Sequence, residues 1–233
     1  MNIVTTKAQI TRVVDLSPTA REVTFTPESQ LAFIPGAFVN VFVDVAGTEH
    51  RRAFSFSSDS SHQESFTLTI RHVPTGAVSP FFWLQDVVGK SVRLMGPLGK
   101  NTVKLLTRPR VFLIGFGVGV SVIKALVHAL VRDPTRSEIH IVTANKNEDE
   151  VLYKDFFTGL ASLDPRVTFR HVISDPHGQE TSERVGLVSD HMDGLDFSGA
   201  DVYLCGPTVA CKGTQRAIDA DSCTDISYFV EQF

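Results

Sequence analysis

The first 108 residues alternate between apolar and polar positions with a period of two. This period is typical of strands that bury one face, because successive side chains of a strand point to opposite sides. Turn residues such as glycine, proline and aspartate separate the alternating segments. Many short strands at this spacing predict a small antiparallel barrel. The expected strands cover residues 8–14, 22–26, 38–45, 66–73 and 91–95, with a further strand through Arg52 and Ser55.

One helix is expected to interrupt this pattern after Ser79-Pro80. Serine is a favoured N-cap, and proline suits the first helical position because its missing N–H is not needed there. We therefore expect Ser79 to cap this helix.

From Pro109 onward the pattern changes to strands that alternate with helices. We expect strands at 111–115, 138–143, 167–173, 201–205 and 226–230, and helices at 120–132, 150–161 and 207–219. Glu148-Asp149-Glu150 is expected to open the second of these helices, where carboxylates favour the helix dipole. The polar segment 175–184 is expected to be an exposed loop. This alternation predicts a doubly wound parallel sheet with helices on both faces.

The expected architecture is therefore a two-domain chain of class β followed by α/β. Residues 1–106 form a six-stranded antiparallel β-barrel, and residues 107–233 form a doubly wound parallel α/β domain. A chain of 233 residues is long enough to bury a substantial core.

The net charge of −4 is unevenly distributed along the chain. Residues 1–108 carry 11 basic and 8 acidic side chains, whereas residues 109–233 carry 11 and 18. No basic run or stripe appears, which argues against nucleic-acid binding. The mildly basic first half suits a ligand diphosphate or an acidic protein partner, although a solvated surface explains most of these charges.

Membrane and metal classes find no support in the sequence. No apolar stretch reaches the ~20 residues that cross a bilayer, and the first residues lack the apolar core of a signal peptide. We therefore expect a cytoplasmic protein without membrane insertion. Three cysteines cannot supply a four-cysteine iron–sulfur site. Neither the cysteines nor the histidines have metal-ligand spacing, and the histidines are expected on the surface or on helix faces: His128, His140, His171, His177 and His191.

A glycine cluster follows the first strand of the second half. Four apolar residues, 111–114, run into Gly115, Gly117 and Gly119, and apolar positions of helical spacing follow. The helix N-terminus has unpaired N–H groups and partial positive charge, so it suits a phosphate. Glycine permits positive φ and a close approach of the ligand to the backbone. The cluster lacks the full G-x-G-x-x-G spacing, so by itself it fits a tight turn in any α/β domain equally well.

Two stretches of the barrel half carry candidate ligand-binding groups. In Arg52-Ala-Phe-Ser55 the guanidinium can pair with phosphate, the aromatic ring can stack and the hydroxyl can bond a ring heteroatom. Regular pairing places Arg52, Phe54 and Phe56 on one face and Ser55 and Ser57 on the other. Taken alone, this stretch is more simply an ordinary strand with core aromatics. The stretch from Arg71 to Ser79 combines a strand, a glycine turn and a helix start, which predicts a second anion site.

The strand at 201–205 ends in Cys205, after which Gly206 supplies a turn and Pro207 opens a helix. Ligands of open α/β sheets bind at the carboxyl ends of the strands, so Cys205 falls where a ligand would lie. The alternative is that Cys205 is a small buried hydrophobe.

In order along the chain, these stretches resemble motifs of the ferredoxin–NADP reductase superfamily of flavoenzymes. Arg52-Ala-Phe-Ser55 resembles its R-x-Y-S/T flavin motif, and 71–79 resembles its R-x-V-x-x-G-x-x-S segment. Further similarities are Pro35-Gly-Ala-Phe38 (P-G-Q-F/Y), Gly96-Pro-Leu-Gly99 (G-P-x-G), Gly117-Val-Gly-Val-Ser121 (G-x-G-I/V-T/S), Cys205-Gly-Pro207 (C-G-P) and Glu231-Gln-Phe233 (E-x-F).

The resemblance implies a barrel that binds FAD. By this carry-over Arg52 holds the flavin phosphate, Phe54 flanks the isoalloxazine and Ser55 bonds near its N5. Gly76 and Ser79 hold the pyrophosphate. The remaining residues assigned to this flavin segment are Arg71, His72, Val73 and Val78.

For the second domain the resemblance implies NADH or NADPH as the electron donor. The residues that would accommodate the nucleotide are Gly115, Gly117, Gly119, Val120 and Ser121, with Cys205, Gly206 and Pro207 beside the nicotinamide. Glu231 and Phe233 would lie by the flavin edge, and Ser55, Cys205 and Glu231 are the candidate catalytic residues. Lys146 either meets a 2′-phosphate or is a solvated lysine, and no acidic residue ends its strand as a mark of NAD.

The function implied is a flavoprotein oxidoreductase that moves hydride from NAD(P)H to FAD and then electrons to a separate acceptor. A ferredoxin, an oxygenase component, a quinone and a ferric chelate are all allowed, and an acidic iron–sulfur protein would suit the basic first half. Two alternatives stay open. A non-catalytic electron-relay subunit is suggested by Phe54, Val122 and Ala210, where the family usually has Tyr, Pro and Met, and Ala37 likewise replaces Gln. A reductase of free flavin or ferric iron is the other alternative.

Overall fold

The computed structural model describes residues 1–61, 64–176 and 181–233. The chain forms two compact units, Met1–Val103 with Lys124–Ala129, and Lys104–Ile123 with Leu130–Phe233. None of the helices in the described ranges combines the length and the apolar character that crossing a bilayer requires.

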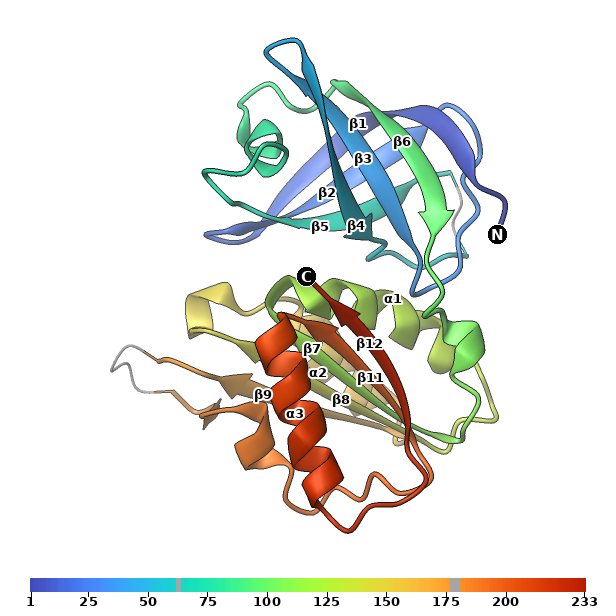
Figure 1. Ribbon diagram of the computed structural model, residues 1–233, viewed down its shortest axis with the longest axis vertical. Coiled ribbons are helices and arrows are strands. Elements are labelled where there is room, and N and C mark those ends of the chain that lie inside the picture. The colour runs from blue at the N-terminus through green and yellow to red at the C-terminus, as the bar shows by residue number, and fades with distance from the viewer. Residues whose placement is uncertain (62–63, 177–180) are drawn as a thin grey trace. The chain divides into compact units, whose positions relative to one another are not determined.

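The first unit is built on a six-stranded antiparallel sheet of order β4-β3-β6-β1-β2-β5 (Figure 1). Its two end strands meet through an isolated bridge between Phe56 and Leu68, which closes the curled sheet. The predicted antiparallel barrel is thus confirmed. Its strands are β1 (Val4–Ser17), β2 (Ala20–Pro27), β3 (Phe38–Val45), β4 (Thr48–Ser55), β5 (Phe66–Arg71) and β6 (Ser91–Leu98).

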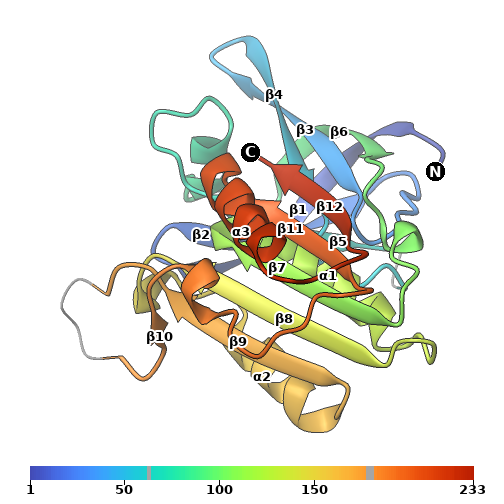
Figure 2. The same cartoon turned by 60° about the horizontal axis from the view of Figure 1, so that its bottom comes forward.

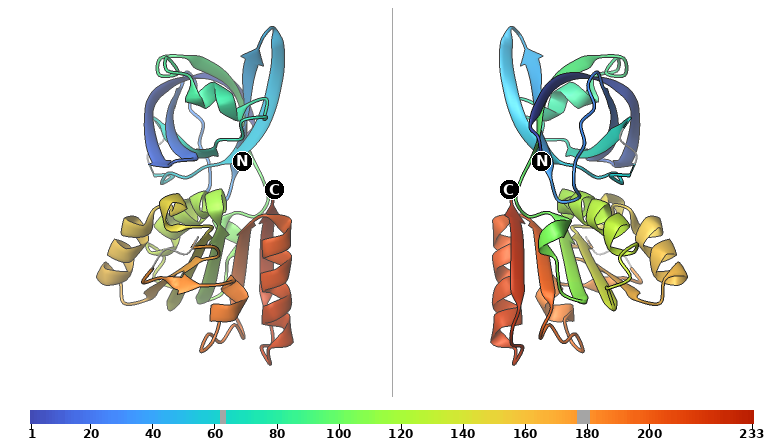
Figure 3. Two further views of the ribbon diagram at one scale, coloured as in Figure 1. Left: turned by 90° about the vertical axis from the view of Figure 1, so that its left-hand side faces the viewer. Right: turned by 90° about the vertical axis from the view of Figure 1, so that its right-hand side faces the viewer.

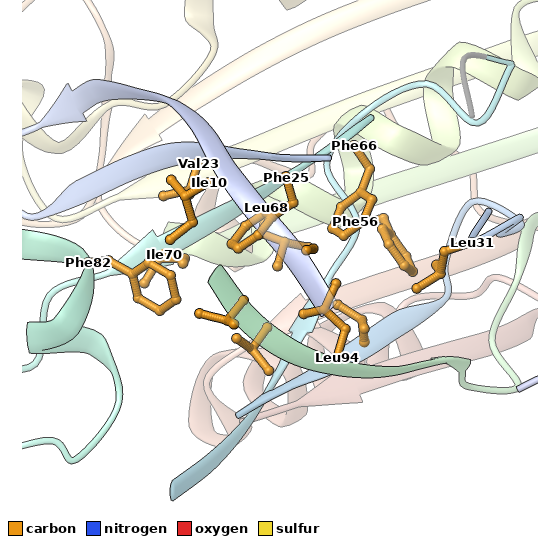
Figure 4. Close-up of a cluster of buried hydrophobic side chains, with 14 of the residues drawn as sticks. Ile10, Val23, Phe25, Leu31, Phe56, Phe66, Leu68, Ile70, Phe82 and Leu94 are labelled. Carbon is orange, nitrogen blue, oxygen red and sulfur yellow. The ribbon is translucent and has the colours of Figure 1, made fainter. Parts of the chain in front are cut away.

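The barrel core consists of inward-facing aliphatic and phenylalanine side chains (Figure 4). Phe33 and Phe56 stack at 3.9 Å between ring centroids, and Phe25 stacks on Phe66 at 5.5 Å. Aromatic pairs of this kind add stabilisation beyond the apolar area that they bury. The side chains labelled in the figure are Ile10, Val23, Phe25, Leu31, Phe56, Phe66, Leu68, Ile70, Phe82 and Leu94.

The expected helix after strand β5 is a short 3₁₀ helix, η1 (Ser79–Trp83). The expected cap is wrong by one residue, because Val78 is the N-cap and Ser79 is the first helical residue. The Ser79 hydroxyl bonds the backbone of Val73 instead of capping the helix. A second short 3₁₀ helix, η2 (Val103–Leu105), leads into the next unit.

The second unit contains a six-stranded parallel sheet of order β10-β9-β8-β7-β11-β12 (Figure 2). Successive strands run outward from β7 in one direction up to β10, and β11 and β12 then lie on its other side. The order reverses between β7 and β11, which makes this the switch point of a doubly wound sheet. The strands are β7 (Arg110–Phe116), β8 (Glu138–Asn145), β9 (Val167–Ile173), β10 (Arg184–Val185), β11 (Asp201–Gly206) and β12 (Ser227–Gln232).

Helices cover both faces of this sheet (Figure 3). Helix α3 (Thr208–Ala220) packs Cys211 and Ile218 against Phe112, Ile114 and other apolar residues of one face. Helix α2 (Lys154–Leu163) and the start of α1 (Val120–Leu130), up to Ile123, lie on the other face. The predicted doubly wound parallel domain is confirmed. Short 3₁₀ turns η3 (Gly117–Gly119), η4 (Glu148–Glu150) and η5 (Val188–His191) complete the unit.

Two local expectations for the second half need correction. Glu148-Asp-Glu150 does not open α2 but forms the separate turn η4, because Tyr153 has a left-handed backbone (φ 59°) and α2 begins only after it. The segment 175–184 is only partly described, and His177 lies outside the described residues. Arg184, at its end, belongs to the short strand β10.

Candidate functional site

Three predicted site residues, far apart in the sequence, lie in one row across the second sheet. Cys205 of β11 is the direct register partner of Gly115 of β7 on one side and of Glu231 of β12 on the other. The row crosses the carboxyl ends of the strands at the switch point, which is where open α/β sheets bind ligands. The strand register thus brings together a glycine turn, a thiol and a carboxylate.

Two helices begin beside this row, and no side chain caps either of them. The helical turn η3 starts after Phe116 and leads directly into α1, whereas α3 starts after Pro207. The first N–H groups of a helix have no partner within the helix, and they carry partial positive charge. Two uncapped N-termini at neighbouring strand ends fit the diphosphate of a dinucleotide.

Glycine is required where these turns cross. A Cβ at Gly119 would lie 2.3 Å from the Cys205 carbonyl oxygen, and one at Gly206 would lie 2.6 Å from the Phe116 side chain. Gly117 and Gly206 have positive φ values of 54° and 155°. The absent side chains let β11 approach the start of α1 closely. Val120 and Ser121, also predicted site residues, are buried at this start.

The Cys205 thiol is held in its neutral form and is not an activated nucleophile. Cys205 is 3% exposed, and burial, reinforced by the Glu231 carboxylate, raises the pKa of its thiol well above the usual value. Tyr203, two residues earlier and fully buried, has its pKa raised by burial and by its hydrogen bond to Glu231. Tyr203 is a residue that the sequence interpretation missed. Phe233 also joins this site, since its N–H donates to the Gly206 carbonyl at 3.4 Å.

The same row continues into β8 and β9 with two residues that the sequence interpretation also missed as a pair. Thr143 is the partner of Gly115, and His171 is the partner of Thr143. The Thr143 hydroxyl and His171 Nδ1 are 2.6 Å apart in a buried hydrogen bond. His171 is 4% exposed, so its expected surface location is wrong, and burial lowers its pKa to about 4. Its position between the apolar residues Phe169 and Val172-Ile173 of a strand was a usable sign of burial.

In the barrel, β4 places Arg52, Phe54 and Ser55 at neighbouring positions. Arg52 is exposed, whereas Phe54 is half-buried against the barrel core and meets the Phe82 ring edge-on at 6.2 Å. Just beyond Ser55, both Phe56 and Ser57 are buried. The Phe56 N–H donates to the Ala37 carbonyl at 3.1 Å, and the Ser57 N–H donates to the Thr67 carbonyl at 2.9 Å.

The segment from Arg71 to Ser79 forms a tight loop that its own serine closes. The Val73 N–H donates to Ser79 Oγ at 2.9 Å, and Ser79 Oγ donates to the Val73 carbonyl at 3.1 Å. The Gly76 N–H donates to the same carbonyl at 2.8 Å. The Ser79 hydroxyl therefore fixes the loop. The Val73 and Gly76 N–H groups thus donate within the loop, and the group that this segment offers to an anion is the exposed Arg71, while Val78 is buried in the core.

An aromatic stack borders this loop. The His72 ring lies on Trp83 at 4.5 Å between centroids, and the Arg21 guanidinium lies 4.8 Å from the same indole ring. Arg21 also donates to the Phe82 carbonyl at 2.8 Å and pairs with Asp15 at 2.6 Å. The loop and η1 are thus attached to the barrel wall by stacking and charge-assisted bonds.

Lys146, the remaining predicted residue, is exposed at the end of β8, and its Nζ lies 3.9 Å from Asp175. In the described part of the chain, no group of three or more histidine, cysteine or acidic side chains is placed to hold a metal ion.

Sequence comparisons match each half of the chain to a known domain family. The oxidoreductase FAD-binding domain family matches residues 7–102, and the oxidoreductase NAD-binding domain family matches residues 113–216. The chain belongs to the ferredoxin–NADP reductase superfamily. It carries the FAD-binding and NAD-binding domains of an oxidoreductase, as its motifs predicted.

Individual members of the superfamily are distant in sequence. The electron transfer component of toluate 1,2-dioxygenase from Pseudomonas putida is 28% identical over 88% of this chain and 60% of its own length. Ferredoxin–NADP reductase B from Sorangium cellulosum is 27% identical over 86% and 85%. Among solved structures, the FAD/NAD-binding domain of a Vibrio cholerae nitric oxide dioxygenase has the same fold, with a TM-score of 0.85, 21% identity and coverage of 97% and 98%. The chain thus spans about three fifths of the first of these relatives.

Proposed function

We propose that this protein is an NAD(P)H-dependent flavoprotein reductase that passes electrons to a separate acceptor. The observation that carries the proposal is the row of Gly115, Cys205 and Glu231 beside two uncapped helix N-termini at the switch point. This arrangement combines a site for an anionic diphosphate with a buried thiol and carboxylate. It lies in a domain that matches the NAD-binding family.

The barrel supports the flavin side of the proposal. The exposed Arg52 supplies a cation for the flavin phosphate, and the half-buried Phe54 offers one ring face while its edge partner Phe82 holds it in place. Ser55 supplies the hydroxyl near the reactive edge. Ser79 closes the loop that follows Arg71, and the pyrophosphate is proposed to bind beside Gly76 and Ser79 of this loop.

When bound, FAD and the nicotinamide supply the redox chemistry, and the protein supplies binding, orientation and electrostatics. Gly117 forms the left-handed turn that leads into the N-terminus of α1, where the diphosphate would bind, and Gly119 lets β11 pack closely against this turn. The raised pKa of Cys205 keeps its thiol neutral, so it acts as a small hydrogen-bonding neighbour and not as a nucleophile. Tyr203 holds the Glu231 carboxylate by a hydrogen bond, which fixes that carboxylate next to Cys205.

The acceptor is proposed as a separate protein or small molecule. The three cysteines of the chain cannot supply a four-cysteine cluster. The toluate dioxygenase relative is an electron transfer component, and a similar role with an oxygenase component or a ferredoxin suits this chain. We place the boundary between the flavin and nucleotide domains at residues 106/107.

Anaerobic mixing of the purified protein with NADH or NADPH tests the proposal. We expect a yellow protein whose flavin absorption bleaches on mixing. A yellow protein that neither nucleotide bleaches would instead identify an electron-relay subunit. Colourless protein that reduces added flavin would identify a free-flavin reductase. Stopped-flow mixing of the reduced protein with candidate acceptors then identifies the electron acceptor.

The cysteines provide a matched pair of variants for the nucleotide side. Cys205→Ala is expected to slow flavin reduction about tenfold or more while the protein stays folded, because it removes the thiol between Gly115 and Glu231. Cys211→Ala is the control: Cys211 is equally buried, but its Sγ lies 3.6 Å from the Gly206 carbonyl under helix α3. Single-turnover rates and urea unfolding distinguish the two. Equal reduction rates in the wild type and Cys205→Ala would make Cys205 a core residue only.

A further inference from the structure

The carboxyl ends of β8 and β9 form a hydrogen-bonded edge of the nucleotide domain. Pairing continues past both strands, since the Ser174 N–H donates to the Asn145 carbonyl at 3.0 Å and the Asp175 N–H donates to the Lys146 carbonyl at 2.7 Å. In dinucleotide-binding sheets, the residue that ends the second strand meets the adenosine ribose. Asn145 ends the second strand here. The groups around Asn145 therefore decide whether a 2′-hydroxyl or a 2′-phosphate is accepted.

The charge of this edge is strongly negative. The described residues in 145–155, 174–176 and 181–185 include three basic and six acidic side chains. Two of the three basic groups, the lysines, are already paired: Lys146 Nζ lies 3.9 Å from Asp175, and Lys154 Nζ is hydrogen-bonded to Glu183. The third is Arg184 of β10. The buried His171 of β9 adds no positive charge at neutral pH, since burial lowers its pKa to about 4. A phosphate dianion would meet paired lysines and several carboxylates.

The side-chain amide of Asn145 at this edge favours a neutral ligand group that donates a hydrogen bond. Asn145 is 4% exposed, and its Nδ2 donates to the Glu150 carbonyl at 2.5 Å, but its Oδ1 is buried without a hydrogen-bond partner. A buried acceptor without a donor is unfavourable. A ribose hydroxyl can donate a hydrogen bond to such an acceptor, whereas a phosphate dianion has no proton to donate.

We propose that this edge makes the protein selective for NADH over NADPH, with Asn145 as the acceptor for the ribose 2′-hydroxyl and with Asp175 and Glu183 holding the lysines away from a 2′-phosphate. The inference rests on the proposed reductase function, since it concerns the nucleotide site of that function. It names the donor that the sequence left open.

Isothermal titration of the purified protein at low salt tests this selectivity without turnover. The probes are NAD⁺, NADP⁺, 5′-AMP and adenosine 2′,5′-bisphosphate. We expect the two probes without a 2′-phosphate to bind about tenfold more tightly than their phosphorylated counterparts, a ratio that narrows as salt screens the carboxylates. Flavin reduction by NADH and NADPH provides the kinetic comparison.

The double variant Asp175→Asn/Glu183→Gln removes the carboxylate paired with Lys146 and the one hydrogen-bonded to Lys154, while Glu148 and Asp155 stay near Lys154. We expect it to strengthen NADP⁺ binding about fivefold while NAD⁺ binding changes less than about twofold. Asp86→Asn is the matched control, because Asp86 pairs with Lys90 at 2.8 Å in the barrel. That control should leave all four affinities unchanged.

The outcomes distinguish a failure of the NADH selectivity from a failure of the proposed reductase function. Equal or tighter binding of the phosphorylated probes, or a double variant that leaves the NAD⁺/NADP⁺ ratio unchanged, would overturn the selectivity while the reductase function stands. If none of the four probes binds, the nucleotide site itself is refuted, and the selectivity with it.

Discussion

A close backbone approach in the nucleotide domain makes Gly119 an informative position to change. In Gly119→Ala, the new Cβ would lie 2.3 Å from the Cys205 carbonyl oxygen and 2.7 Å from its carbonyl carbon. Even weak C–H···O contacts have C···O separations of about 3.3–3.6 Å. The end of β11 or the start of α1 must therefore move by roughly 1 Å.

The atoms that would be struck are backbone, so no flexible side chain can give way. Overpacking of this kind costs typically about 1–3 kcal/mol, and we expect Gly119→Ala to lose ~3 kcal/mol of unfolding free energy. The displaced turn carries the N–H groups proposed to bind the diphosphate. A misplacement of ~1 Å can cost about a hundredfold in the reaction rate, so NAD⁺ affinity and the rate of flavin reduction should both fall at least about tenfold.

Urea unfolding followed by circular dichroism, together with titration of NAD⁺, measures both effects. Gly159→Ala is the control, because Gly159 lies within helix α2 and a Cβ there would meet nothing within 4 Å. We expect the control to gain about 0.5–1 kcal/mol from helix propensity and to bind NAD⁺ normally. A Gly119→Ala protein as stable as wild type, with unchanged affinity, would refute the close-packing argument.

Three further predictions concern buried polar groups of the second unit. Asp201 is 1% exposed and accepts from the Thr107 and Arg108 N–H groups at 2.6 and 2.9 Å, so Asp201→Asn should lose about 2 kcal/mol of unfolding free energy. Asp225→Asn, the control, removes the exposed partner of Arg108 and should lose less than about 1 kcal/mol. Equal losses for the two variants in urea titration would contradict this prediction. The native pKa of His171, about 4, lies below its unfolded value of 6.5, so its neutral form stabilises the fold above pH ~6.5, and this contribution is lost as the pH falls toward 4. Between pH 7 and pH 5 the wild type should lose about 2 kcal/mol more unfolding free energy than His171→Gln. Parallel pH profiles of the two proteins would show that His171 is not buried in its neutral form. Tyr203→Phe should cost about 1.5–3 kcal/mol of unfolding free energy by removing the donor to Glu231. Tyr228→Phe, which removes the exposed hydrogen bond to Asp219 at 2.7 Å, should cost under about 1 kcal/mol. Chemical denaturation of the two variants measures both losses, and a smaller loss in Tyr203→Phe would contradict a buried hydrogen bond between Tyr203 and Glu231.

Much of the fold could be predicted from periodicity, because each half has a single dominant pattern. Strands 38–45 and 167–173 have the predicted bounds, since clear turn residues or charged positions flank a run of β-branched and aromatic side chains. The start of α2 was missed because it depends on Tyr153 in a left-handed conformation, which a sequence pattern for non-glycine residues does not reveal. The role of Ser79 was misjudged for a similar reason, since its hydroxyl prefers the backbone six residues earlier.

The candidate site could be predicted as a set of motifs but not as an arrangement. Cys205 and Gly115 were both expected at strand ends, yet their direct pairing, and that of Cys205 with Glu231, follows from strand register. Register depends on how whole strands pair, and no local segment encodes it. Tyr203 was missed because it lies among the apolar residues of β11. The surface location expected for His171 was wrong because its hydrogen-bond partner, Thr143, lies on another strand.

Trp83, which stacks on His72, allows intrinsic fluorescence to distinguish the two units. Trp83 is the sole tryptophan of the chain and lies in the barrel unit, whereas all three tyrosines, Tyr153, Tyr203 and Tyr228, belong to the other unit. Light absorbed selectively by the indole therefore reports on one unit, and tyrosine emission reports on the other. Loss of flavin or melting of the barrel would register in the first signal, and loosening of the nucleotide sheet in the second, so one unlabelled sample can show which unit opens first.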